Sequence, residues 1–198
     1  MGVEKRMADR CNTIRLYSFQ TDVVYQVLKR DGVCYSKEEY VRKKYKESAK
    51  VFINAYGWFV KEAQYIVPKP EGAEYPYWAF TDLYNVDQTG DGHVLTLDVP
   101  IGEAILFDMF DWTKIMQMHY IGENESEEAA FSEELKNMGM NEFQIMTSNF
   151  YPEQKARIQE SWKRLFGHQQ AIEAGDNSGV HSVQAGLWCI KGEWIVKE

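Results

Sequence analysis

Cysteine is scarce in this chain, and the few that occur lie far apart. The sequence holds three, Cys11, Cys34 and Cys189, and no two of them form a CxxC pair. A zinc site of the usual cysteine type therefore lacks its ligands. An odd number of isolated cysteines is typical of a reducing compartment, in which disulfides do not persist. We therefore expect a cytoplasmic protein without a metal site.

Long apolar runs are also absent. No stretch approaches the roughly 18 to 20 apolar residues that a membrane-spanning helix needs. The chain does not open with a charged segment followed by an apolar one, as a secretion signal would. We therefore expect no membrane partner.

Basic residues are outnumbered, with 22 Lys and Arg against 30 Asp and Glu and a net charge of −8. Nucleic-acid-binding proteins usually present a basic face that displaces counterions from phosphates. The single basic run, residues 42–46, is short and is followed by Glu47, which indicates a solvated helix face. We therefore expect no nucleic-acid partner.

The motifs of several common enzyme classes are missing. There is no GxSxG elbow, phosphate-binding P-loop or GxGxxG turn, and the four histidines never pair at i, i+4. Residues 87–98 resemble part of a calcium loop, but Thr89 and Asp98 stand where that loop needs an acidic or amide side chain and a glutamate. The Asp and Gly residues of this stretch predict a tight turn instead.

Aromatic residues are plentiful by contrast, with six Trp and twelve Tyr. Such side chains bury large areas, so a packed core is easily reached. A surplus of them can also line a ligand groove, although additional core is the simpler interpretation.

Apolar periodicity divides the chain into short strands and helices. Period-two alternation predicts strands at residues 14–20 and 94–99. Further strands are expected at residues 76–81, at 104–107 as a short buried strand, and in a final hairpin of 182–190 with 193–197. Helical spacing predicts helices at residues 21–32, 36–47, 52–63, 112–121, 123–134 and 152–166, whereas residues 138–149 fit either state.

The order of these elements indicates the fold class. Strands and helices do not alternate regularly, and no repeat or linker divides the chain. We predict an α+β fold in which residues 13–198 form a single domain, with a mixed or antiparallel sheet and helices packed around it. Residues 1–12 are polar and patternless, and we expect a flexible extension there.

Two sets of residues allow specific structural predictions. Asp108 or Asp111 is expected to cap the helix that begins near Trp112, with a carboxylate facing a cleft as the alternative. Five residues on apolar stripes are expected to be mostly buried: Trp58, Leu95, Leu97, Trp162 and Phe166.

Polar residues within apolar strands are the candidate ligand-binding groups. Gln20 ends the first strand, and Gln184 lies inside a late strand in which alternation places it on the same face as Trp188. A buried amide needs a partner, so these residues either lie at a wet sheet edge or point into a cleft. With Tyr77 and Trp78 as stacking candidates, we expect Gln20, Trp78 and Gln184 to converge on one aromatic-lined cleft.

Several segments together resemble an uncharacterised bacterial family, domain of unknown function 3841, over about residues 14–197. The resemblance lies in residues 16–20, 56–58, 75–80, 94–100, 107–112, 161–166 and 183–188. The first strand reads Tyr-Ser-Phe-Gln where the family has a Trp-Thr-Ile-Gln pattern. The family carries no established activity, so the resemblance implies kinship without a function.

A second resemblance is to ADP-ribosyltransferase-like folds. It lies in the first strand with its terminal polar residue, in the strand of residues 94–100, and in a late strand bearing a polar residue. In that superfamily NAD lies between two small sheets, so the resemblance implies that Gln20 holds the nicotinamide ribose and Gln184 orients the reacting sugar. A catalytic Glu is missing at Gln184, and an amide cannot act as a base.

Three hypotheses for the function follow. The first is a small-molecule or nucleotide-binding domain with an aromatic-lined cleft. The second is an NAD-handling enzyme of ADP-ribosyltransferase-like fold, with NAD or another nucleotide as cofactor. The third is a non-catalytic protein-interaction or defence accessory protein. Two small sheets flanking a cleft would favour the enzyme, and an exposed apolar patch would favour the accessory protein.

Overall fold

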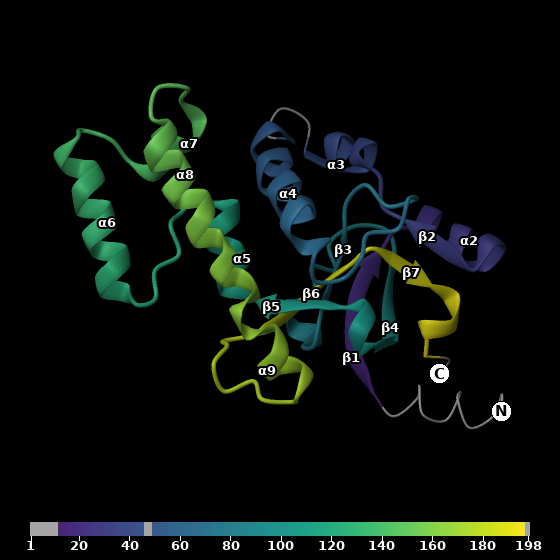
Figure 1. The fold of residues 1–198 in the computed structure, drawn as a ribbon. Helices are drawn as coiled ribbons and strands as arrows, with labels where there is room; N and C mark the ends of the chain where they lie inside the picture. Colours follow the sequence, from purple (N-terminus) through teal and green to yellow (C-terminus); the bar gives the residue numbers. More distant parts are fainter. Residues whose placement is uncertain (1–11, 46–48, 197–198) are drawn as a thin grey trace.

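A five-stranded antiparallel sheet occupies the centre of the molecule (Figure 1). In the computed structural model, which describes residues 12–45 and 49–196, the strand order is β4-β1-β3-β6-β5. The strands are β1 (Thr13–Gln20), β3 (Tyr77–Phe80), β4 (His93–Pro100), β5 (Ile105–Asp108) and β6 (Val183–Leu187). Together with the helices, the sheet confirms the predicted α+β class. Residues 1–11, 46–48 and 197–198 lie outside the described part, and so does most of the predicted extension.

A second, two-stranded sheet shows that the predicted C-terminal hairpin is wrong. Here β2 (Val33–Tyr35) pairs with β7 (Cys189–Lys191), whereas β6 pairs with β3 and β5. Trp188 separates β6 from β7, and its indole Nε1 donates to the Val67 carbonyl at 2.7 Å. This buried Trp takes the chain out of the first sheet, and residues 192–194 then form a short 3-10 turn instead of a returning strand.

The helices largely follow the predicted stripes. Their bounds are α2 (Asp22–Asp31), α3 (Glu38–Tyr45), α4 (Ala49–Ala63), α5 (Met109–Met116), α6 (Glu125–Asn137), α7 (Glu142–Thr147), α8 (Pro152–Ser161) and α9 (Gln169–Glu173). Short 3-10 segments include η2 (Leu83–Asn85) and η4 (Trp162–His168). The ambiguous residues 138–149 contain α7, which a capping box of Asn141 and Gln144 starts.

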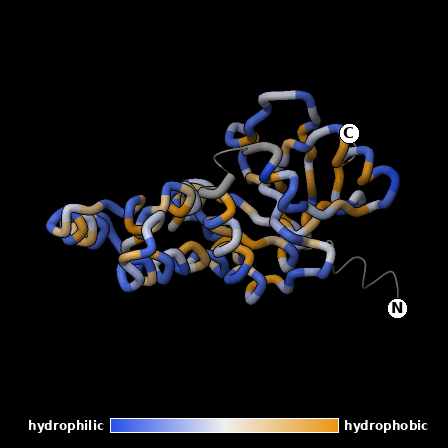
Figure 2. Tube along the Cα trace, turned by 90° about the horizontal axis from the view of Figure 1, so that it is seen from above, coloured by the Kyte–Doolittle hydropathy of each residue, from blue (hydrophilic) through white to orange (hydrophobic). Residues whose placement is uncertain are grey.

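The sheet has a separate core on each face. On one face, residues from α4, α5, α8 and η4 pack over Phe107 and Trp78. On the other, Leu16, Leu97 and Ala185 pack with residues of α2 and the small sheet. Helices α5 to α8 extend away from the sheet as a helical arm (Figures 1 and 2). Among the described residues, no helix combines the length and apolar character needed to cross a membrane.

The predicted core residues lie close to where the stripes place them. Trp58, Leu95, Leu97 and Trp162 are buried, as predicted. Phe166 is only half-buried, because it lies at the margin of the core with its ring stacked 5.8 Å from that of Trp58. The apolar stripes therefore identify the interior positions and are less accurate at the rim of the core.

Removal of the Trp162 side chain tests this packing. The residue is 0% exposed, its ring meets that of Trp58 at 5.4 Å, and its Nε1 donates to the His119 carbonyl at 2.6 Å. We expect Trp162→Ala to lower the free energy of unfolding by about 3 to 5 kcal/mol in urea titrations, since it leaves a large cavity. Trp162→Phe should cost less. The matched control is Tyr65→Ala at an exposed ring, and an equal effect of the two Ala variants would contradict the assignment.

Candidate functional site

The predicted ligand residues lie on both faces of the large sheet. Strand register pairs Phe80 with Gln184 and Trp78 with Gly186, which places Gln184 and Trp78 on the face covered by α4 and α5. Gln20 lies on the opposite face, where its Nε2 donates to Ser18 Oγ at 2.8 Å. The expected convergence of Gln20, Trp78 and Gln184 on one cleft is therefore not formed.

The three predicted aromatic residues are engaged within the protein. Trp78 Nε1 donates to the Tyr56 hydroxyl at 2.8 Å, and Trp188 Nε1 is held by the Val67 carbonyl. Tyr77 is buried with its hydroxyl 3.1 Å from Cys34 Sγ, and burial together with that thiol raises the pKa of the phenol. These rings build the interior around the sheet.

Gln184 differs from the other candidates because its amide is not engaged. The residue is only 3% exposed, yet its side chain makes no hydrogen bond to any residue in the described part of the chain. No fully buried side-chain polar atom among those residues lacks a partner, so solvent must still reach the amide. A buried position with an available donor and acceptor is well suited to ligand contact.

Asp108 lies one strand away from Gln184, at the end of β5. Its Oδ1 accepts the Phe110 N–H at 3.0 Å, which caps α5 and confirms the capping prediction for Asp108. The helix therefore begins at Met109, three residues before Trp112. The Oδ2 atom accepts the backbone N–H of His181 at 3.0 Å and its ring Nδ1 at 2.8 Å. Burial alone would raise the pKa of Asp108, but the bonds from His181, Phe110 and Ser182 outweigh it and lower the pKa.

His181 combines a fixed ring with an open approach. Because an ionised carboxylate only accepts hydrogen bonds, Nδ1 carries a proton toward Asp108 and Nε2 faces away from it. The side chain is 73% exposed, and the half-exposed ring of Phe110 lies 4.8 Å from the imidazole. Next to them, Asn85 Nδ2 donates to Ser182 Oγ at 2.7 Å and so fixes η2 beside the site.

We call this surface the β5–β6 rim, formed by Asn85, Asp108, Phe110, His181 and Ser182. Gln184 lies on the opposite face of the sheet from Asp108, because Gln184 pairs with Phe107 and Asp108 pairs with Val183. Residue spacing could not identify the rim, because Asp108 and His181 are 73 positions apart. They meet only because β5 and β6 are neighbours, with Asp108 opposite Val183. The local signal is a carboxylate that ends an apolar strand, for which a helix cap was expected and a carboxylate facing a cleft was the alternative.

Asp111 lies one helical turn beyond Asp108 in a different environment. Burial raises its pKa, Lys114 opposes that shift, and the negative charge of Asp108 adds to it. Its nearest cation is Lys114 Nζ, at 3.7 Å. Among the residues that the structure describes, no group of three or more His, Cys, Asp or Glu is placed to hold a metal ion. Cys11 lies outside them.

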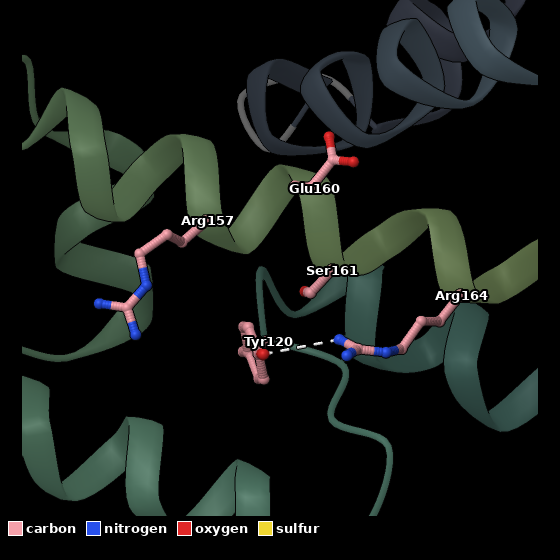
Figure 3. A pocket seen from close by; sticks show the side chains of 5 residues that line it. All are labelled: Tyr120, Arg157, Glu160, Ser161 and Arg164. Atoms are coloured by element: carbon pink, nitrogen blue, oxygen red, sulfur yellow. Dashed lines mark hydrogen bonds between the residues drawn. The ribbon is translucent and has the colours of Figure 1, made fainter.

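A hollow of about 390 Å³ lies in the helical arm, away from the rim (Figure 3). Its lining includes Arg157 and Arg164, whose side chains extend toward the side on which Tyr120 lies, whereas Glu160 points away. Arg157 forms a bidentate pair with Glu134, and Arg164 donates to the Ile121 carbonyl at 2.8 Å. These contacts hold α6 and the segment before it against α8, so we interpret the hollow as structural.

A second hollow of about 400 Å³ lies beside His119, whose Nδ1 contacts a carboxylate oxygen of Glu142. The hydrogen bond that His119 donates to Glu142 raises the pKa of His119, with burial opposing it. The preceding residue, Met118, has a φ of 64° and no exposure, so the turn after α5 carries backbone strain. The contact between His119 and Glu142 ties α7 to the end of α5.

The comparisons with known proteins identify a family and nothing closer. A family model described as Domain of unknown function (DUF3841) matches residues 15–196. No curated protein and no solved structure matches the chain. The first resemblance is therefore confirmed, and the similarity to ADP-ribosyltransferase-like folds stays a hypothesis.

Asp108→Asn tests whether this carboxylate organises the rim. The amide nitrogen of Asn would face N–H groups whose hydrogen bonds Asp108 now accepts. We therefore expect the free energy of unfolding to fall by about 1 to 3 kcal/mol at pH 7. Because the folded state lowers the pKa of Asp108, its contribution is present above the unfolded pKa and is lost as pH falls through the folded one.

The difference between wild type and Asp108→Asn should therefore shrink on acidification, measured by urea titration at several pH values. Asp176→Asn is the matched control, because Asp176 accepts the Ser178 N–H at 3.0 Å in an exposed turn. We expect the control to change stability much less than Asp108→Asn does, because Asp176 is exposed. Equal effects of the two variants would contradict the organising role.

Proposed function

The chain belongs to the family described as domain of unknown function 3841, and we propose that it binds a small, planar, polar molecule of the nucleotide class at the β5–β6 rim. The observation that carries this proposal is the imidazole of His181, which a buried carboxylate holds in an exposed position beside the ring of Phe110. Besides capping α5, the buried Asp108 fixes this exposed ring, and a fixed exposed ring is suited to contact with another molecule.

The rings of the rim suit a planar ligand. Phe110 is 50% exposed at the start of α5, where an apolar ring would normally be turned inward. Tyr84, in the adjoining η2, is exposed as well. Stacking on a base or nicotinamide ring would cover this apolar area.

The imidazole of His181 supplies the polar contact. Its Nε2 faces away from Asp108 and can accept a hydrogen bond from a ribose hydroxyl or an amine of a base. Because Asp108 restricts the orientation of the ring, binding would cost little ordering of this side chain. Gln184 lies on the other face of β6, opposite Phe107 and Phe80. The net charge of −8 favours a ligand of low negative charge, such as a nucleoside monophosphate or NAD.

The other predicted ligand residues take supporting roles in this proposal. Gln20 bonds to Ser18 Oγ on the far face, and Tyr77, Trp78 and Trp188 stabilise the strands that carry Gln184. ADP-ribosyl transfer is the weaker alternative. The chain does have two sheets, but an amide stands at Gln184 where transfer chemistry needs a carboxylate, and residues including Cys34 and Leu16 fill the space between the sheets.

A thermal-shift experiment with AMP and NAD tests the proposal. A ligand that binds the folded state at 100 times its Kd stabilises it by about 2.7 kcal/mol. In a chain of this size that corresponds to a rise in Tm of about 5 to 11 °C. His181→Ala and Phe110→Ala should lose most of this rise while the free variants stay folded.

Phe150→Ala is the matched control, because this exposed ring lies in the helical arm, between α7 and α8. It should respond to the nucleotides as the wild type does. The proposal fails if neither nucleotide raises the Tm, or if His181→Ala and Phe110→Ala leave the rise unchanged.

A further inference from the structure

We propose that His181 is a general base and that the β5–β6 rim hydrolyses a carboxylic ester carried by a planar, polar molecule of the class it binds. This inference rests on the proposed binding function and adds a reaction to it. It assigns the proton-accepting role to ring Nε2 of His181, and the role of a positioning residue to Asp108.

Asp108 fixes the imidazole from two directions. The same oxygen, Oδ2, accepts both the backbone N–H and the ring Nδ1 of His181, at 3.0 and 2.8 Å. The other oxygen is held by the Phe110 N–H, so the carboxylate cannot turn away. A ring fixed by a buried carboxylate presents Nε2 in one orientation and with one tautomer, as a general base requires.

Two other histidines with a carboxylate partner provide a comparison. His93 Nε2 lies 2.6 Å from Asp22 Oδ1, but the side chain of Asp22 is 71% exposed, and such a pair is a weak surface ion pair. His119 Nδ1 contacts the more buried Glu142, but the side chain of His119 is 48% exposed, against 73% for that of His181. His181 therefore combines a ring fixed by a buried carboxylate with the more open approach.

The source of the proton follows from the neighbouring groups. Among the described residues, no hydroxyl or thiol forms a hydrogen bond to the His181 ring. Ser182 Oγ accepts from Asn85, and Thr81 Oγ1 donates to the Val183 carbonyl. The described residues therefore place no nucleophile on the ring, and we assign the proton to water.

The step is a hydrolysis. Nε2 removes a proton from a water molecule as the water oxygen bonds to the acyl carbon, and the carbonyl electron pair moves to its oxygen. When that pair returns, the ester C–O bond breaks and the leaving oxygen departs with its electrons. The imidazolium gives up its proton to the leaving group or to solvent. An ester and water become an acid and an alcohol, without a change of oxidation state.

Hydrolysis of p-nitrophenyl acetate by the full chain tests this assignment. We expect His181→Ala to lower the protein-dependent rate at least about tenfold, because general bases contribute at least that much. Asp108→Asn should lower the rate as well, whereas His93→Ala and Asp22→Asn should leave it unchanged. Added imidazole should restore part of the rate of His181→Ala, and the wild-type reaction should be slower in D2O.

Three results would overturn the assignment: an unchanged rate in folded His181→Ala, an equal loss in His93→Ala, or a reaction without a solvent isotope effect that passes through an acetyl-imidazole. His181→Gln serves as a second variant, and since His181 is exposed both variants should fold. Failure of the binding proposal is distinguishable. If hydrolysis depends on His181 but neither AMP nor NAD raises the Tm, the general base is supported and nucleotide binding is refuted. If a nucleotide raises the Tm but no hydrolysis is found, nucleotide binding is supported and the general base is refuted.

Discussion

The carboxylate of Asp108 connects the end of β5, the start of α5 and the residues before β6. It ends β5, caps α5 and accepts both the backbone N–H and the ring Nδ1 of His181 just before β6. These elements come from distant parts of the sequence, and each needs a partner for a backbone N–H group that would otherwise be unpaired. One buried anion meets these needs, and the energetic cost of its burial is offset by the hydrogen bonds it accepts.

The rest of the structure positions that anion. Strand β6 lies between β3 and β5, and its two faces contact separate cores. Strand β5 is at the edge of the sheet, where Gln169 takes the place of a neighbouring strand: its Oε1 accepts the Leu106 N–H, and its Nε2 donates to the Ala104 carbonyl. In the arm, the Arg157 guanidinium lies over Phe131, which stacks on Tyr120 at 4.4 Å. The rim therefore lies on a rigid support, as a site with fixed side-chain orientations requires.

Local patterns predicted local features well. The α+β class, the strand of residues 14–20 and the burial of Trp162 follow from periodicity alone, and the cap at Asp108 follows from residue type. The order of strands in the sheet depends on contacts between distant segments, and this order determines which residues form the site. Gln20 and Gln184 are both amides on apolar strands, but the register places them on opposite faces of the sheet. His181 carried no signal in the sequence, because its partner is brought to it only by the pairing of β5 with β6.

The tautomer of His181 tests the organising role of Asp108 most directly. Long-range ¹H–¹⁵N spectra of the neutral side chain distinguish a proton on Nδ1 from one on Nε2. Wild-type protein should show the proton on Nδ1, since an ionised carboxylate accepts from that atom. In Asp108→Asn the proton should move to Nε2, while the signals of His93 stay as they were. A wild-type His181 with its proton on Nε2 would contradict the arrangement, and with it the exposed base on which the proposed chemistry depends.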